Sequence, residues 1–301
     1  MLFRSARWGR WLVLGWAIVV ILLFVILRPI WLSFAIFLGV TALFFAWWFR
    51  LKPRHDRDWE STVAVLPRAV REGDAITMEN VRNFDYRSLD DFTPRYETRT
   101  YHLANLRGVD AIFFVWEISW MGHPVLVFDF GPDGRICMSI EVRFRKGQRY
   151  SIIRGLYRQQ ELIFLAADER DVILRRTKYS PNQKAYLYRL NVEAEELRAV
   201  FLDYVEAINK LRERPRWYHV IFTNCATAFY RLPSTRYRLD WRVIANGRLP
   251  WALYKDGRLD RTLPFAELRQ LAYLNDVANA APEEGFGDHI RHELEKRRHE
   301  R

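Results

Sequence analysis

Cys225 is the residue whose type and setting most favour covalent chemistry in this chain. It lies in the run Thr223-Asn-Cys-Ala-Thr-Ala-Phe-Tyr230, where polar residues precede the thiol and helix-compatible residues follow it. This pattern predicts a cysteine at the N-terminus of a helix, where unpaired amide groups and the helix dipole favour the thiolate and lower the pKa. A single cysteine is more often a small buried hydrophobic residue, so its assignment as a nucleophile depends on other residues.

His123 is the candidate base for this thiol. It follows Gly122 and opens an apolar segment, 124–130, that predicts a buried strand, whereas the other six histidines lie in polar, loop or tail settings or beside no obvious partner. A cysteine and a histidine that are far apart in sequence can form a nucleophile–base pair once a sheet has folded. The alternative is a structural histidine that only hydrogen-bonds a buried partner.

Glu141, in the next predicted strand, is the candidate third group that would orient the imidazole. Its position depends on the register of the hairpin. If 131–134 forms a four-residue loop, His123 pairs with Val142 and Glu141 faces the other side of the sheet. Glu141 therefore joins the candidate site only if a bulge changes this register.

An apolar block near the N-terminus predicts a membrane anchor. The 39 residues from Trp11 to Phe49 contain a single charge, Arg28, which is followed by Pro29. A bilayer core needs about 20 apolar residues per helix, so the block predicts two spans, 11–27 and 30–49, that turn at Arg28-Pro29. A cleaved signal peptide is the alternative, but the block is about twice as long as the apolar part of such a peptide.

The positive charge of the chain is concentrated beside this block. Residues 1–57 contain eight Lys/Arg and one acidic residue, whereas the rest contains 39 basic and 35 acidic residues. This distribution favours contact with anionic lipid headgroups over nucleic acid. The charges flank both ends of the block, so the charge rule alone places both termini and the following domain in the cytoplasm.

The remaining residues predict an α+β domain. Strand-like segments come first and helices later, with an amphipathic helix at 192–212 and further short strands that include 172–177. We expect four parts: a membrane anchor of two transmembrane helices at 1–50, a polar connector at 51–75, a catalytic domain at 76–232 and a C-terminal extension at 233–301. The charged residues 168–171 and 175–176 predict a solvated loop and strand end, with binding of an anionic lipid head or substrate as the alternative.

Cofactor chemistry is not indicated. The sequence has neither zinc-ligand spacing nor a glycine-rich phosphate loop, so we expect no metal and no organic cofactor. Cys137 and Cys225 do not form a disulfide pattern. We also expect no nucleic-acid partner.

An ordered series of motifs in residues 54–230 resembles the family described as the Lnb N-terminal periplasmic domain. The series comprises Asp56-Arg-Asp-Trp59, Asn80-Val-Arg-Asn-Phe-Asp-Tyr86, His123 in its strand, Ser139-Ile-Glu-Val-Arg143, Gly155-Leu-Tyr-Arg-Gln-Gln-Glu161, Asp168-Glu-Arg-Asp-Val-Ile-Leu-Arg175 and Asn224-Cys225. Lnb is a bacterial lipoprotein N-acyltransferase. Its domain is similar to circularly permuted papain-like enzymes of the NlpC and lecithin:retinol acyltransferase type.

The resemblance implies a permuted papain-like domain in which Cys225 is the nucleophile, His123 the base and Glu141 the orienting group. Asn224 would support the oxyanion together with the Cys225 amide. The implied function is acyl transfer or hydrolysis on a lipid-linked or cell-envelope substrate, including lipoprotein N-acylation, with membrane lipids as partners. The alternative is a non-catalytic envelope protein that binds or assembles. The resemblance also implies a bacterial inner-membrane protein with a periplasmic domain, against the charge rule. In Lnb the membrane region is C-terminal, whereas here it is N-terminal.

Overall fold

The computed structural model describes residues 6–116, 121–180, 182–235 and 246–300, with side chains from residue 11 onward. The chain divides into two compact units, Met1–Lys52 and Pro53–Arg301.

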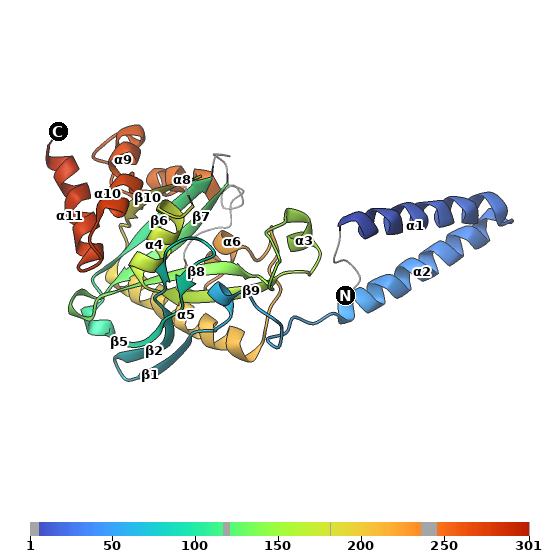
Figure 1. The fold of residues 1–301 in the computed structure, drawn as a ribbon, viewed down its shortest axis with the longest axis horizontal. Coiled ribbons are helices and arrows are strands. Elements are labelled where there is room, and N and C mark those ends of the chain that lie inside the picture. Colours follow the sequence, from blue (N-terminus) through green and yellow to red (C-terminus); the bar gives the residue numbers. More distant parts are fainter. Residues whose placement is uncertain (1–5, 117–120, 181, 236–245, 301) are drawn as a thin grey trace. The chain divides into compact units, whose positions relative to one another are not determined.

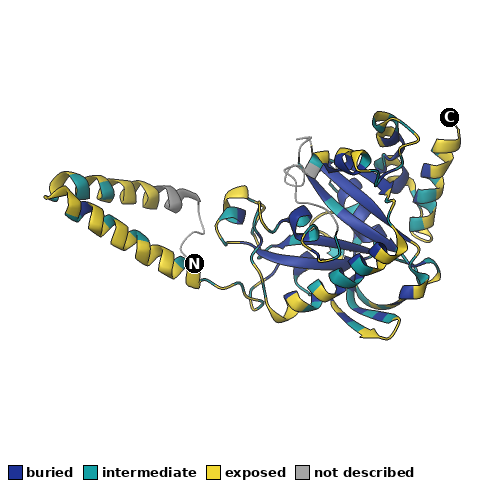
Figure 2. Cartoon of the chain, turned by 180° about the vertical axis from the view of Figure 1, so that it is seen from behind, coloured by how far each residue is buried: buried dark blue, intermediate teal, exposed yellow. Residues whose placement is uncertain are grey.

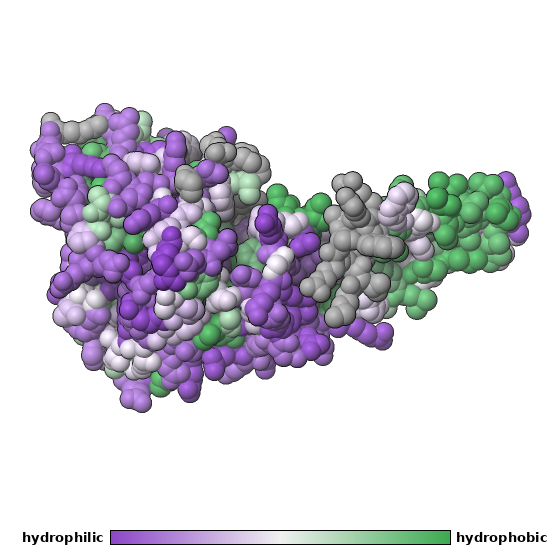
Figure 3. All heavy atoms as spheres, in the orientation of Figure 1, coloured by the Kyte–Doolittle hydropathy of each residue, from purple (hydrophilic) through white to green (hydrophobic). Residues whose placement is uncertain are grey.

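The first unit is a helical hairpin made of α1 (Ala6–Ile26) and α2 (Ile30–Arg50), which meet at Arg28–Pro29 as predicted. The hydroxyl of Ser33 donates to the carbonyls of Leu23 and Leu27, at 3.0 and 3.3 Å, and so links the two helices. Most of its apolar side chains are exposed, and they form the apolar surface visible in Figures 2 and 3. By itself α2 is long and apolar enough to cross a membrane, whereas the apolar part of α1, Trp11–Ile26, is shorter.

The second unit is built on an eight-stranded, mostly antiparallel sheet (Figure 1). Its strands are β1 (Arg68–Glu72), β2 (Ala75–Arg82), β5 (Tyr96–His102), β6 (Gly108–Trp116), β7 (Gly122–Asp129), β8 (Arg135–Arg143), β9 (Glu161–Ala167) and β10 (Gln183–Arg189). The order is β1-β2-β9-β8-β7-β6-β10, with β5 also paired to β2. Two short strands, β3 (Asp85–Tyr86) and β4 (Phe92–Thr93), pair separately. The predicted α+β class is confirmed.

Helices cover both faces of this sheet. One face packs against α5 (Ala194–Glu213), α6 (Cys225–Phe229) and α8 (Leu249–Lys255), and we call it the α5 face. The other face packs against α4 (Glu169–Thr177), α10 (Asn275–Ala280) and α11 (Phe286–His299), and we call it the α4 face. Two further helices are α3 (Ile152–Leu156) and α9 (Phe265–Leu271). Because both faces are covered, the central strands are almost continuously apolar rather than alternately apolar and polar.

The helices of residues 249–299 are part of this core. Leu249 and Leu253 of α8 are buried on the α5 face, whereas Ile290 and Leu294 of α11 are buried on the α4 face. A fully buried Leu or Ile side chain contributes about 1.5–3 kcal/mol. The segment expected to be a C-terminal extension therefore helps to hold both helical layers on the sheet.

The segment 172–177 is a correction to the predicted elements. It is helical and belongs to α4, which begins after Asp168 because the Asp168 carboxylate accepts the Arg170 amide at 2.9 Å. The neighbouring charges were predicted to lie in a solvated loop, but most of them are buried: Glu169, Arg170, Asp171 and Arg176 are at most 9% exposed. Charged residues rarely occupy buried positions unless they are paired. The charges of this segment therefore indicated exposure to solvent, and the prediction missed a buried helix.

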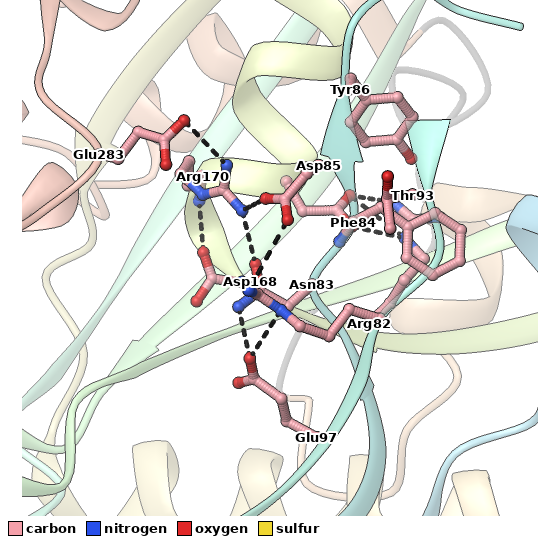
Figure 4. Close-up of polar contacts among 12 residues, drawn as sticks. Arg82, Asn83, Phe84, Asp85, Tyr86, Thr93, Glu97, Asp168, Arg170 and Glu283 are labelled. Carbon is pink, nitrogen blue, oxygen red and sulfur yellow. Dashed lines mark hydrogen bonds and ion pairs between the residues drawn. The ribbon is translucent and has the colours of Figure 1, made fainter. Parts of the chain in front are cut away.

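The buried charges at the start of α4 are paired with groups from other elements. Arg170 contacts Asp85 and donates to Asn83 at 3.1 Å, while the Asn83 amide donates to Glu97 at 2.7 Å (Figure 4). Glu283 lies 3.7 Å from Arg170. Arg170 therefore already has acidic partners, and this favours a structural role for Arg170 over the alternative of anionic-ligand binding.

Asp171 forms the most buried of these contacts. Its carboxylate accepts three hydrogen bonds from Arg82, the shortest at 2.6 Å, and one from the Phe84 amide at 2.7 Å. Both charged side chains are at most 1% exposed. The Arg82 guanidinium also donates to the Thr62 carbonyl at 3.0 Å, so this pair ties the connector, β2 and α4 together.

Asp171→Ala should lower the free energy of unfolding of the domain by about 3–5 kcal/mol, because it leaves the Arg82 charge buried without its partner. The midpoint of thermal unfolding of the detergent-solubilised chain measures the change. Asp91→Ala is the matched control, because Asp91 pairs with Arg87 on the surface and both side chains are more than half exposed. Equal effects of the two substitutions would contradict the structural importance of the Arg82–Asp171 pair.

Candidate functional site

His123, Ser139 and Glu141 form a hydrogen-bonded group on the α4 face of the sheet. The imidazole Nε2 lies 2.8 Å from the Ser139 hydroxyl, which donates to the Glu141 carboxylate at 3.0 Å. Nε2 also lies 3.5 Å from that carboxylate. Arg176 of α4 completes the group with a 2.7 Å ion pair to Glu141. Sequence reasoning placed His123 and Glu141 here but missed Ser139 and Arg176.

The register of the β7–β8 hairpin brings these residues onto one face. Asp129 pairs with Arg135 and Val125 with Ser139, so the connecting loop has five residues, 130–134. The Phe130 amide donates to the Gly134 carbonyl at 2.9 Å across this loop. The prediction of a four-residue loop was wrong by one residue, and the shift turns Glu141 to the side of His123 without a bulge.

The charges around the imidazole keep it neutral. Burial lowers the pKa of His123, and the nearby Arg176 guanidinium lowers it further, whereas Glu141 opposes both effects. Burial alone would raise the pKa of the Glu141 carboxyl, but Arg176 and the hydrogen bond from His123 hold it well below its ordinary value. At neutral pH the group therefore combines an ionised Glu141 with an uncharged His123.

These protonation states determine the tautomer of His123. An ionised carboxylate only accepts hydrogen bonds, so the single proton of the Ser139 hydroxyl points to Glu141. The serine oxygen must then accept from the Nε2–H of His123. The lone pair of the neutral ring is left on Nδ1, which is the position where a base would take a proton.

Cys225 is the first residue of α6, as predicted. The side-chain oxygen of Asn224 caps this helix by accepting hydrogen bonds from the backbone amides of Ala226 and Thr227, at 2.9 and 2.8 Å. The side-chain nitrogen of Asn224 donates to the Val220 carbonyl. The backbone amide of Asn224 donates to the Thr227 hydroxyl at 2.8 Å, which completes a capping box. Asn224 was predicted to support an oxyanion, but these bonds occupy its side chain in capping.

The expected low pKa of Cys225 is a second correction. Burial raises the pKa of the Cys225 thiol to about 12, and the negative charge of Glu141 adds to the increase, while the Ala226 amide opposes it. The helix has only five residues, so few aligned peptide dipoles favour the thiolate. The residue itself is partly exposed, whereas Cys137 is fully buried and burial also raises its pKa.

The neighbours of the two candidate catalytic groups belong to different apolar clusters. Side chains alternate along β7, so His123 shares the α4 face with Val125, whereas Pro124 faces α5. The helix that begins with Cys225 buries Ala226 on the α5 face. The His123 ring contacts Ser139 and Glu141. Pairing of Cys225 with His123 therefore stays a prediction.

An apolar cavity of about 80 Å³ borders Cys225 on the α5 face. Its walls come from β6, β7 and β8 on one side and from α5, α6 and α8 on the other. Tyr204 also lines this cavity. Its hydroxyl is buried and has no hydrogen-bond partner among the described residues. Sequence reasoning used Tyr204 only as a core residue of the amphipathic helix.

Metal ligation has little support in the part of the chain that the structure describes. No group of three or more His, Cys, Asp or Glu side chains is arranged there to hold a metal ion.

Alkylation of Cys225 should accelerate about tenfold per pH unit from pH 7 to beyond 9, because only the thiolate reacts and its fraction keeps rising below the pKa. Peptide mass spectrometry after iodoacetamide treatment at each pH measures the rate. The fully buried Cys137 should stay unmodified, and the denatured chain should level off near pH 8.5 at both cysteines. A plateau for Cys225 below pH 8.5 in the folded chain would contradict a raised pKa.

Comparison with known proteins identifies the family. Residues 92–255 match the Lnb N-terminal periplasmic domain, a range that contains His123, Ser139, Glu141, Arg176 and Cys225. No curated protein and no solved structure matches the chain. The family and the apolar helix α2 fit a membrane protein with a periplasmic domain. The chain therefore belongs to the family described as the Lnb N-terminal periplasmic domain.

Proposed function

We propose that this protein is a membrane-anchored, cysteine-dependent acyltransferase or hydrolase that acts on a lipid-linked or cell-envelope substrate. Lipoprotein N-acylation is one reaction of this class. The observation that carries the proposal is the position of Cys225, a partly exposed thiol at the edge of an apolar cavity in a membrane-anchored protein. A permuted papain-like arrangement of Cys225 and His123 is part of the proposal.

The proposed chemistry begins with two neutral groups. The Nδ1 atom of His123 takes the proton of the Cys225 thiol while the sulfur attacks the substrate carbonyl. Collapse of the tetrahedral intermediate breaks the bond to the leaving alcohol or amine, which receives the proton from the imidazole. The acyl group remains on Cys225 as a thioester until water or an amine accepts it.

The hydrogen-bonded group on the α4 face supports this role for His123. Once the ring takes a proton, the ionised Glu141 and the Ser139 hydroxyl stabilise the imidazolium, as the third residue of a catalytic triad does. Contact between the imidazole and the sulfur would form when substrate binds, because catalytic hydrogen bonds often tighten only in that complex. The Cys225 amide is the proposed donor to the oxyanion, since the Asn224 side chain is engaged in the cap.

In phospholipid vesicles the wild-type chain should acquire an acyl group on Cys225 that neutral hydroxylamine removes. Intact-mass and peptide mass spectrometry measure the adduct. Cys225→Ala should abolish it, and His123→Ala should slow its formation about 10²–10⁴-fold because the general base is lost. Cys137→Ala, the matched control, should leave it unchanged. Acylation that persists without Cys225 would contradict the proposed nucleophile.

A non-catalytic binding protein is the second candidate function. The raised pKa of Cys225, together with the hydrogen bond between His123 and Ser139, favours it. In this alternative the fold and the cavity serve binding or assembly alone. The alternative predicts that Cys225→Ala leaves the cellular function of the protein intact.

We also propose that the domain is periplasmic and that the hairpin lies in the bacterial inner membrane. The family description supports export, and a long domain can be translocated whatever its charge. A reporter enzyme that is active only after export should therefore be active when fused after residue 60. Activity of a reporter that folds only in the cytoplasm would instead support the orientation given by the charge rule.

A further inference from the structure

We propose that the domain has a membrane-docking surface, formed by the segment around α3 and by the turn 219–223, which inserts hydrophobic side chains among anionic phospholipid headgroups. This docking surface consists of six residues: Tyr150, Ile152, Ile153, Tyr157, Ile221 and Phe222. The inference rests on the proposed function only where docking delivers a membrane-held substrate to Cys225. Exposure, local geometry, charge and the route of the chain support the docking surface independently of that function.

Large hydrophobic side chains gather on this surface. Among the described residues from Pro53 onward, nine large hydrophobic side chains are exposed, and six of them belong to the docking surface. Ile153 is 68% exposed and Phe222 is 56% exposed. Exposed apolar side chains that lie together, unlike single ones, mark a site that binds a protein or a membrane.

The two segments of the docking surface are joined to each other. The Val220 amide donates to the Gly155 carbonyl of α3 at 3.3 Å. The approach is so close that a Cβ at position 155 would lie 2.4 Å from a Val220 methyl group. The Tyr218 amide adds a 2.9 Å hydrogen bond to the Gln160 carbonyl, just after α3. The turn and α3 are therefore parts of one surface.

The turn presents hydrophobic residues at its tip. The backbones of His219 and Thr223 exchange two hydrogen bonds, at 3.2 and 2.9 Å. Nδ1 of His219 also accepts the amides of Ile221 and Phe222, at 3.2 and 3.3 Å, and the His219 ring lies 4.7 Å from the Phe222 ring. Turns in water are usually made of Gly, Pro, Asn, Asp or Ser, so a hydrogen-bonded tip of Ile and Phe suits insertion into a membrane. Cys225 follows the turn by two residues, and docking would bring this thiol to the bilayer surface.

The charges of these segments suit anionic headgroups. Residues 144–160 contain five Lys/Arg and no Asp/Glu, and residues 214–223 add two arginines, again without an acidic residue. Arg149 precedes Tyr150 and Arg154 follows Ile153, so positive charges lie between the hydrophobic residues. Basic residues combined with exposed hydrophobic ones are typical of segments that lie in the membrane interface, where anionic lipids attract them. The charge therefore favours a lipid surface over an apolar protein partner.

The chain enters the domain at the same edge. Arg57 lies 2.7 Å from the Glu161 carboxylate, and Trp59 forms a β-bridge with Arg145. Arg145 and Glu161 flank the segment that contains α3, which lies beyond the ends of β8 and β9 (Figure 1). The helix α2 ends at Arg50, and seven residues of extended chain span at most about 25 Å. A bilayer crossed by α2 therefore lies within reach of this edge of the domain.

Spin labels on the full chain test docking without any thiol chemistry. On the Cys225→Ala chain, in vesicles of phosphatidylethanolamine and phosphatidylglycerol, a nitroxide at Phe222→Cys or Ile153→Cys should be more accessible to oxygen than to an aqueous nickel chelate. Its depth should be about 5–10 Å, as for other interfacial segments. The matched control is Leu89→Cys, which is 42% exposed but outside the docking surface and should stay in water. Cys137 is fully buried and should take no label.

Substitutions in one segment should act on a label in the other. With the nitroxide at Ile153→Cys, Phe222→Ser should lower the ratio of docked to undocked chains about tenfold, whereas Phe222→Leu should preserve docking. Arg149→Gln combined with Arg154→Gln should also lower this ratio about tenfold, and vesicles of phosphatidylcholine alone should weaken docking in the same way.

Two outcomes would overturn the docking surface. The first is a label at Phe222→Cys that is as accessible to the nickel chelate as the label at Leu89→Cys. The second is a label that is shielded from both reagents in detergent as well as in vesicles, which would show contact with a protein, such as a second copy of this chain.

The link to the proposed function has a separate test. Phe222→Ser should slow formation of the Cys225 thioester in vesicles about tenfold, because fewer chains are docked, while the thermal midpoint stays unchanged. Equally fast thioester formation would overturn the role of docking in substrate delivery. Docking as expected, but with no thioester on the wild-type chain, would support the docking surface and reject the proposed catalysis.

Discussion

The register between β7 and β8 is the constraint on which both sides of the candidate site depend. The five residues 130–134 connect these strands, and Gly131 and Gly134 take backbone φ values of 56° and 87° that side chains rarely allow. This loop sets Ser139 opposite Val125 on the α4 face and Met138 opposite Leu126 on the α5 face. A shift of one residue would exchange the two sets, placing Ser139 in the apolar cavity and Met138 among the charges around Arg176.

The ladder between β7 and β8 ends before His123. The recorded pairing of β7 with β8 extends from Asp129↔Arg135 to Val125↔Ser139, and His123 lies beyond it. Pro124 follows His123 and has no amide to donate to β8. The imidazole is therefore placed where the two strands are no longer held together by this ladder. On its other side β7 stays paired with β6, where His123 lies opposite Phe114.

Much of the fold could be predicted from the sequence. Apolar patterns located the paired hydrophobic helices, the central strands and α5, because burial of apolar side chains dominates those elements. The prediction failed where buried charge replaces buried apolar surface, as in α4, since polarity there results from pairing within the fold and not from exposure. The ion pair of Arg82 with Asp171 joins residues 89 positions apart, and no local pattern indicates it.

The candidate site was predicted to a similar extent and for similar reasons. Residue type and order in the sequence identified Cys225 and His123 as candidates. Ser139 and Glu141 are two positions apart on one strand, so a correct register would have placed both side chains on the face of His123. The pKa of Cys225 could not be predicted, because burial and the distant Glu141 charge outweigh the dipole of a five-residue helix.

A raised thiol pKa beside a neutral imidazole changes the type of mechanism that the site can support. Enzymes with a preformed thiolate–imidazolium pair need an environment that stabilises both charges before substrate arrives. Here burial disfavours both charges, Arg176 further disfavours the imidazolium, and its favourable effect on the thiolate is smaller than the effect of burial. Charge separation would therefore have to occur during the reaction, when the substrate carbonyl accepts the electrons of the sulfur and Glu141 stabilises the protonated ring. At neutral pH such a thiol would react slowly with small electrophiles, and in the proposed mechanism its reaction with a carbonyl would depend on a bound substrate that brings the thiol and the imidazole together.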